Sequence, residues 1–228
     1  MSVDRASRPR SDEPARGGRP TARRFSRPEL FHRVECQSEH GQRLVRRGLR
    51  RAANALYGLE VVLYALAEDQ DAVEALEQVI DNKMEALESQ IDAAVKKYQT
   101  VMAAHEGLPQ PTYRHPLRAK LVIASPRMMT LAVLIEQYDG LVQMIDRLWF
   151  GRVIKNREHS NVVYQLRTAF FDVANSLAEL ERGARAAALR RGHLDADTAA
   201  GDEDAVEIEE TGADATDSRR SVFSFGGR

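Results

Sequence analysis

Cysteine and long apolar runs are both scarce in this 228-residue sequence. Cys36 is the single cysteine, which excludes an internal disulfide and fits a reducing, cytoplasmic location. No apolar run approaches the roughly 18 residues that a membrane span needs, and the stretch 59–66 is too short. The first residues carry arginine with no apolar core behind it, so we expect no secretory signal.

Glycine-rich phosphate-binding motifs are also missing. The glycine pairs at 17–18 and 226–227 lie in the tails, so the sequence has neither a P-loop nor a dinucleotide-binding fingerprint. The histidines outside the N-terminal region fall in predicted loops or at helix ends, and they assemble no serine–histidine–acid arrangement. We therefore expect a non-catalytic protein with no cofactor and no small-molecule substrate.

His32, Cys36 and His40 follow one another at a spacing of four residues, which on a helix lines one face and could hold a metal ion. On a strand, His32 and His40 would lie roughly 26 Å apart at 3.3 Å per residue. Gly41 weakens a helix here, and no fourth ligand follows at a matching spacing, so we predict no metal site. Alternation within 29–39 leaves a short strand and a helical lead-in both open.

The charges are segregated along the chain. From Asp4 to Arg51 there are fourteen arginines against six acids, a net charge of +8. From His193 to Asp217 there are ten acids and neither lysine nor arginine. A basic head and an acidic tail indicate an anionic partner, with the tail as a competitor for it.

Two stretches of apolar residues at helical spacing follow the basic head. The first runs from 41 to about 66, and the second, from 73 to 102, is the longest and meets no glycine or proline before Gly107. The acid-rich break at 68–71 between them is short, so the pattern predicts a long antiparallel helical hairpin over 41–106.

A strand-helix-helix unit is predicted over 116–190. Side chains alternate between two faces from Leu117 to Ala124, which is typical of a strand. Ser125 then supplies a helix N-cap, and Pro126 is tolerated at the first helical position. The apolar periodicity of the following segment and of 157–190 predicts two more helices.

These segments predict a mainly α fold with one or two short strands. The single helical domain spans 29–192. A basic arm at 1–28 and an acidic tail at 193–228 flank it, and both have too few apolar residues to order themselves.

The short strand at 117–124 carries the basic side chains Arg118 and Lys120 on one face. A two-stranded ribbon with such side chains fits the major groove of DNA, and the helix N-terminus behind it can take a phosphate. One chain offers only one good strand of this kind, so the idea requires a second copy and hence a homodimer. The alternative is that Arg118 and Lys120 form the solvated face of a small strand packed on the helices.

Several of these residues carry a family resemblance. They are the apolar strand with a small residue–proline step at 117–126, Tyr138-Asp139, Leu141-Val142, Gly58-Leu59 and the acid-rich break at 68–72 before Leu76. Over about 34–177 the sequence resembles the AcaB-like transcriptional regulators and related proteins of integrating conjugative elements and conjugative plasmids.

This resemblance implies a ribbon-helix-helix-like dimer that binds double-stranded DNA and regulates genes of a mobile element. The ribbon would be the segment from Leu117 to Ala124. Its DNA-facing residues would be Arg118, Lys120 and Val122, with Ser125 and Arg127 on phosphate. We also expect phosphate contacts from the start of the first helix, at Arg46, Arg47 and Arg50.

The alternative function is a non-catalytic helical adaptor that acts through protein–protein contacts. In that hypothesis the apolar face of the helix at 73–102, including Leu87 and Ile91, binds helices of another protein. The two hypotheses differ in the surface they use, since one uses the strand and the other uses the longest helix.

Overall fold

The structure, a computed structural model, describes residues 30–66, 69–123, 125–192 and 208–210. Its elements follow in chain order: β1 (Leu30–Cys36), α1 (Glu39–Arg43), the π-helical segment η1 (Leu44–Leu49), α2 (Arg50–Ala65), α3 (Gln70–Ala103), β2 (Leu117–Ile123), α4 (Pro126–Phe150), α5 (Asn156–Arg190) and β3 (Ile208–Glu210). The fold is mainly α with short strands, as predicted. The stretch 29–39, left open by its sequence, contains a strand followed by a helix start.

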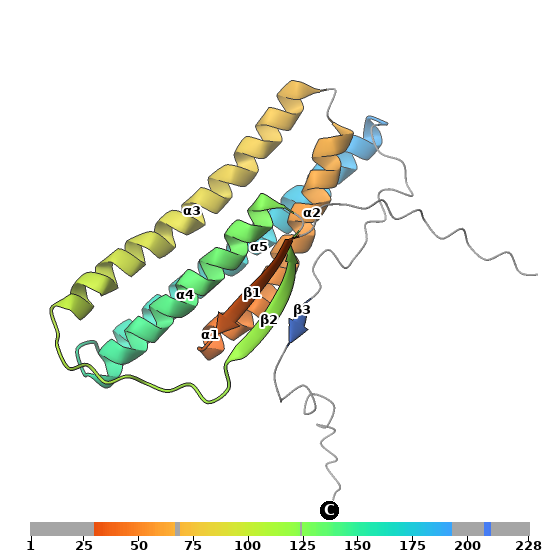
Figure 1. The fold of residues 1–228 in the computed structure, drawn as a ribbon. Coiled ribbons are helices and arrows are strands. Elements are labelled where there is room, and N and C mark those ends of the chain that lie inside the picture. The colour runs from red at the N-terminus through yellow and green to blue at the C-terminus, as the bar shows by residue number, and fades with distance from the viewer. Residues whose placement is uncertain (1–29, 67–68, 124, 193–207, 211–228) are drawn as a thin grey trace, which may run out of the picture.

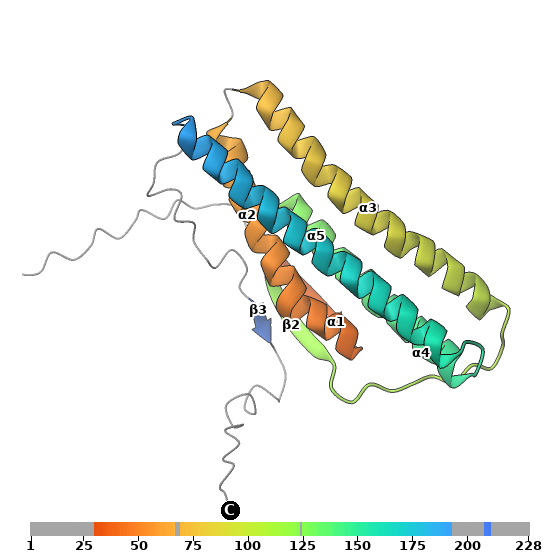
Figure 2. The ribbon, with the colours of Figure 1, turned by 180° about the vertical axis from the view of Figure 1, so that it is seen from behind.

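Long helices form the bulk of the molecule, and the sheet lies along the side away from α3 (Figures 1 and 2). α2 packs mainly against α5, whereas α3 packs against α4 and, less extensively, against α5. α2 and α3 run in opposite directions, as the hairpin prediction requires. The main packing partners of α2 and α3 are nevertheless α5 and α4, from the C-terminal half of the chain, and the two helices of the hairpin do not pack mainly on each other.

Helix starts follow local capping chemistry. The Ser38 side chain accepts from the Gly41 N–H at the start of α1, and Asp69 accepts from the Ala72 N–H at the start of α3. Ser125 accepts from the Met128 N–H, and a proline occupies the first turn of α4, as predicted.

The core is centred on α4, the most buried of the long helices. Eleven of its residues are buried. All of them except Asp139 belong to one apolar cluster that also includes side chains of β1, α2, α3, β2 and α5. Two buried tyrosines, Tyr98 and Tyr138, bridge helices within it by hydrogen bonds: the Tyr138 hydroxyl donates to the Val163 carbonyl at 3.0 Å, and the Tyr98 hydroxyl donates to Glu158 at 3.1 Å.

The predicted disordered arm at 1–28 lies outside the described residues. Within the acidic tail, residues 208–210 form β3, so these three residues correct the prediction that the whole of 193–228 is disordered. Across the described part of the chain, no helix is long and apolar enough to cross a membrane.

Candidate nucleic-acid interface

β1 and β2 form an antiparallel two-stranded ribbon within one chain. The register runs from Leu30 opposite Ile123 to Cys36 opposite Leu117. The sequence interpretation required a second copy to complete the ribbon, and this requirement is wrong, because residues 30–36 supply the second strand. The alternation in 29–39 is compatible with a helical lead-in as well as with a strand, so the sequence alone does not identify this partner of β2.

Alternation gives the ribbon two chemically different faces. The inner face packs on the helices, with buried side chains at Val34, Cys36, Leu117, Ala119, Leu121 and Ile123. The outer face of the ribbon consists of Phe31, Arg33 and Glu35 from β1 and Arg118, Lys120 and Val122 from β2. The predicted set of Arg118, Lys120 and Val122 therefore does share one outward face.

Cations dominate this outer face. Arg33 lies directly opposite Lys120, and Glu35 lies opposite Arg118, with 3.4 Å between Arg118 Nε and Glu35 Oε2. The Lys120 ammonium lies over the Phe31 ring, 4.2 Å from its centroid. A pocket of about 530 Å³ lies at this part of the ribbon, lined by Arg33, Val34, Glu35, Arg118, Ala119 and Lys120.

Arg33 is a candidate interface residue that the sequence interpretation missed. Its signal was present, because Phe31, Arg33 and Glu35 alternate with His32, Val34 and Cys36. Only the pairing with β2 shows that Arg33 belongs beside Lys120.

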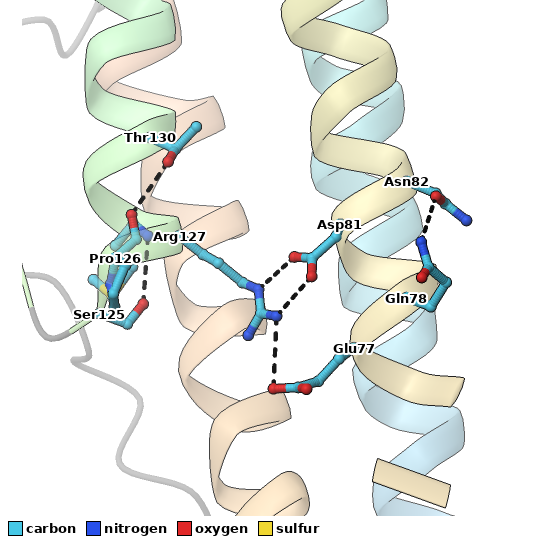
Figure 3. A network of polar contacts seen from close by, with 9 residues as sticks. Glu77, Gln78, Asp81, Asn82, Ser125, Pro126, Arg127 and Thr130 are labelled. Atoms are coloured by element: carbon cyan, nitrogen blue, oxygen red, sulfur yellow. Dashed lines mark hydrogen bonds and ion pairs between the residues drawn. The ribbon is translucent and has the colours of Figure 1, made fainter. Parts of the chain in front are cut away.

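Arg127 and Ser125, predicted to meet phosphate, have other roles. The Arg127 guanidinium donates to both carboxylate oxygens of Asp81 on α3, at 2.8 and 3.0 Å, and lies 3.7 Å from Glu77 (Figure 3). This hydrogen-bonded pairing lowers the pKa of Asp81 and raises that of Arg127. Ser125 is buried and caps α4. Arg127 holds α4 to α3 and Ser125 starts α4, and the phosphate contacts expected of these two residues stay a prediction.

Arg46, Arg47 and Arg50 are exposed on the helical run that follows β1. Arg46 and Arg47 belong to the π-helical segment, and Arg50 begins α2. In this segment Gly48 approaches the Phe170 ring of α5 so closely that an added Cβ would lie 3.0 Å from it. The three arginines lie on this helical run and not on the ribbon strands, and their phosphate contacts stay a prediction.

The buried carboxylate of Asp139 fixes the junction between β1 and α1. Its Oδ1 accepts from the Ser38 backbone N–H at 2.9 Å and from the Ser38 hydroxyl at 2.6 Å, while Oδ2 accepts from the Gln37 N–H at 2.8 Å. Gly41 lies against this carboxylate, and an added Cβ there would overlap it. Asp139 thus ties the end of β1 to α4, which gives this position of the sequence a structural role.

His159 and Asp146 form a histidine–acid pair with a structural role. His159 Nε2 and Asp146 Oδ1 lie 2.7 Å apart, and the Tyr113 hydroxyl donates to Asp146 Oδ2 at 2.6 Å. Burial, followed by the hydrogen bond to Asp146, raises the pKa of Tyr113. The three side chains tie the loop before β2 to the helices α4 and α5.

His32, Cys36 and His40 do not come together on one helix. His32 and Cys36 lie on β1, where His32 contacts Glu136, and His40 lies on α1. Burial raises the pKa of the Cys36 thiol, and burial with the nearby Arg167 lowers that of His40. Within residues 30–66, 69–123, 125–192 and 208–210, no group of three or more histidine, cysteine, aspartate or glutamate side chains is arranged to hold a metal ion.

Comparison with family models and with curated proteins finds no match. Comparison with solved structures finds the crystal structure of selenomethionine-containing AcaB from uropathogenic E. coli. The TM-score is 0.69 at 26% sequence identity, and the match covers 73% of this chain and 86% of the AcaB chain. The resemblance drawn from the sequence is confirmed at the level of the fold: this chain has an AcaB-like fold.

Proposed function

We propose that this protein is a cytoplasmic, non-catalytic DNA-binding transcriptional regulator of an integrating conjugative element or conjugative plasmid. The outer face of the ribbon would bind double-stranded DNA. The observation that carries the proposal is the placement of Arg33 directly opposite Lys120 on that face. Like charges directly opposite one another destabilise a strand pair, and an anion between them removes that cost.

The dimensions of the ribbon suit the major groove. The groove is about 12 Å wide and admits a two-stranded ribbon, whose strands lie roughly 4.8 Å apart. Arg33 and Arg118 would supply forked donors that match guanine edges or phosphate oxygens, and Lys120 a point charge. Glu35 is the acid on this face, and its ion pair with Arg118 orients the arginine side chain in the absence of DNA.

The AcaB-like fold supports a regulator-like role. The family resemblance drawn from residues 34–177 adds the genetic context, since it implies regulation of conjugative-element genes. The segregated charge adds a further argument, because the chain carries a net charge of +8 from Asp4 to Arg51. Arginines in that stretch, including Arg46, Arg47 and Arg50, would add salt-sensitive phosphate contacts to those of the ribbon.

A homodimer is not needed to complete the ribbon, but it would allow two ribbons to bind one DNA site. Each chain already holds a complete ribbon, so a dimer would place two ribbons on two half-sites of a symmetric DNA site. We propose this arrangement, and sedimentation of the chain with and without duplex DNA tests it.

The helical-adaptor hypothesis loses the surface on which it depended. Leu87 and Ile91 on α3 are almost fully buried, at 0% and 1% exposure, in the same core as α4 and α5. Charged substitutions there would unfold the protein, so they cannot report on a partner.

The proposal is tested by a pair of double variants in a duplex-DNA titration. Arg118→Ala with Lys120→Ala should weaken binding by roughly tenfold or more and flatten its salt dependence. Lys96→Ala with Arg182→Ala removes the same charge from exposed positions on α3 and α5 and should leave the affinity within about twofold. Equal losses in the two variants would overturn the assignment of the ribbon as the DNA-binding surface.

A further inference from the structure

The second edge of β2 is occupied by the chain's own acidic segment. β2 pairs with β1 on one side, and on the other it pairs antiparallel with β3. The register places Glu210 opposite Ala119, Glu209 opposite Lys120 and Ile208 opposite Leu121. Figures 1 and 2 both show β3 beside β2 at the margin of the sheet.

A strand edge offers unpaired N–H and C=O groups, and extended peptides commonly bind such edges as an added strand. β3 contributes three residues, so the ladder contains few hydrogen bonds. The fifteen residues 193–207 join it to the end of the helical domain, and a chain of that length spans up to about 50 Å. Connectivity therefore allows the segment to bind at the edge of β2 and also to leave it.

We propose that the β2 edge is a strand-addition site for an extended acidic segment, and that residues 208–210 bind there in competition with DNA for the ribbon. The proposal rests on the DNA-binding function proposed above for the outer face. Its partner class is an acidic peptide in extended conformation, and the chain supplies that peptide itself.

Size provides the first argument for competition. The major groove accommodates two strands, and a third strand widens the sheet by roughly 4.8 Å. The three-stranded sheet β1-β2-β3 is therefore too wide for the position that the two-stranded ribbon would take. DNA binding would require β3 to leave.

Charge provides the second argument. β2 carries Arg118 and Lys120, and the register sets Glu209 directly opposite Lys120. The surrounding sequence, from His193 to Asp217, has ten acids and no lysine or arginine. An acidic segment held at this edge lowers the positive potential that attracts phosphate, so salt should weaken both the docking of β3 and the binding of DNA.

Two full-length variants separate strand pairing from charge. Ile208→Pro keeps every acid but removes a backbone donor and disfavours the strand. Glu209→Gln with Glu210→Gln keeps the backbone and removes two charges. The matched control is Asp214→Asn with Asp217→Asn, which removes two charges from the same tail beyond β3.

Duplex-DNA titration at about 50 mM salt is the first measurement. Ile208→Pro and the Glu209–Glu210 variant should each bind DNA at least threefold more tightly than the unaltered chain, while the control stays within twofold. An unchanged affinity in Ile208→Pro would overturn the competition.

Hydrogen exchange in the segment Ala119–Leu121 is the second measurement, made without DNA. Exchange should be faster in Ile208→Pro than in the unaltered chain, because β3 no longer protects that edge. Equal exchange in the two proteins would overturn the docking itself. Failure of every variant to bind DNA would instead refute the proposed function, and the exchange comparison would still decide whether the β2 edge binds the acidic segment.

Discussion

Arg33 and Lys120 lie directly opposite each other across the β1–β2 ribbon, on the face turned away from the helices. Lys120 also covers the Phe31 ring, which holds its ammonium on that face. Like charges directly opposite one another disfavour a strand pair, and on its other side Lys120 lies opposite Glu209 of β3. The cost is understandable at a surface that binds an anion, and the relationship therefore links the strand register to the proposed function.

Replacing Arg33 should separate stability from DNA binding. Arg33→Thr removes the like-charge pair and introduces a residue that favours strands, so the free energy of unfolding should rise by about 0.2–1 kcal/mol. DNA affinity should fall roughly fivefold or more, because one cationic contact is lost. Urea unfolding and DNA titration measure the two effects. Glu35→Gln is the comparison variant, and it should tighten DNA binding because it removes an acid from the same face. An Arg33→Thr protein with normal DNA affinity would contradict the assignment of this face as the DNA-binding surface.

The Asp139 carboxylate should be essential for folding stability. Asp139→Ala leaves the Ser38 and Gln37 N–H groups without their acceptor in a buried place, and we expect a loss of about 3 kcal/mol or more, measured by urea unfolding. Gln143 donates to the same carboxylate from a partly exposed position at 2.9 Å, so Gln143→Ala should cost about 1 kcal/mol or less. An Asp139→Ala protein as stable as the Gln143→Ala protein would show that the junction does not depend on this carboxylate.

Substitution of Arg127 should affect stability and leave DNA binding intact. Arg127→Ala removes the forked contact to Asp81 and the ion pair with Glu77, and about 1–3 kcal/mol of unfolding free energy should be lost. Arg127→Lys keeps the charge but cannot form the fork, so it should restore only part of the stability. DNA affinity of both variants, measured where they are folded, should stay within about twofold. A selective loss of affinity with normal stability would return Arg127 to the interface.

The same pair predicts a pH dependence. Arg127 holds the pKa of Asp81 below its ordinary value of 3.8, so the pairing contributes stability above that pH, and the contribution is lost as the pH falls through the lowered pKa. The advantage of the unaltered chain over Asp81→Asn should be about 1 kcal/mol or less, because Asp81 is half-exposed, and it should shrink below about pH 4. Urea unfolding at pH 6 and pH 3 measures it. Glu85→Gln, which changes another acid of α3, is the control. If the unaltered chain is more stable than Asp81→Asn by the same amount at both pH values, the Arg127–Asp81 pair does not cause the pH dependence.

Local signals predicted the elements well, because capping and periodicity act over a few residues. Ser125 and Pro126 predict the start of α4, and the alternation of side chains from Leu117 predicts β2. β1 is as long as β2 but was ambiguous, because polar and apolar residues occur on both of its faces, whereas one face of β2 is entirely apolar. Its pairing with β2 decides the matter.

Long-range partners were beyond local reasoning. Arg127 follows a helix cap and resembles a phosphate ligand in sequence, but its acceptor Asp81 lies 46 residues earlier. Leu87 and Ile91 form a clear apolar face, and nothing local shows that this helix buries the face within its own chain. Arg33 could not be assigned to the interface from the sequence either, because only the strand register shows that it lies opposite Lys120.

The measurement that tests the central claim most directly is a titration of the unaltered chain with random-sequence duplex DNA over a series of salt concentrations. Its oligomeric state should be determined in the same buffer. We predict binding at about 50 mM salt, with an affinity that falls linearly with salt concentration on a log–log plot and a slope that reports the number of phosphates contacted. No binding at that salt concentration by the folded protein would contradict the assignment of the ribbon as a DNA-binding surface.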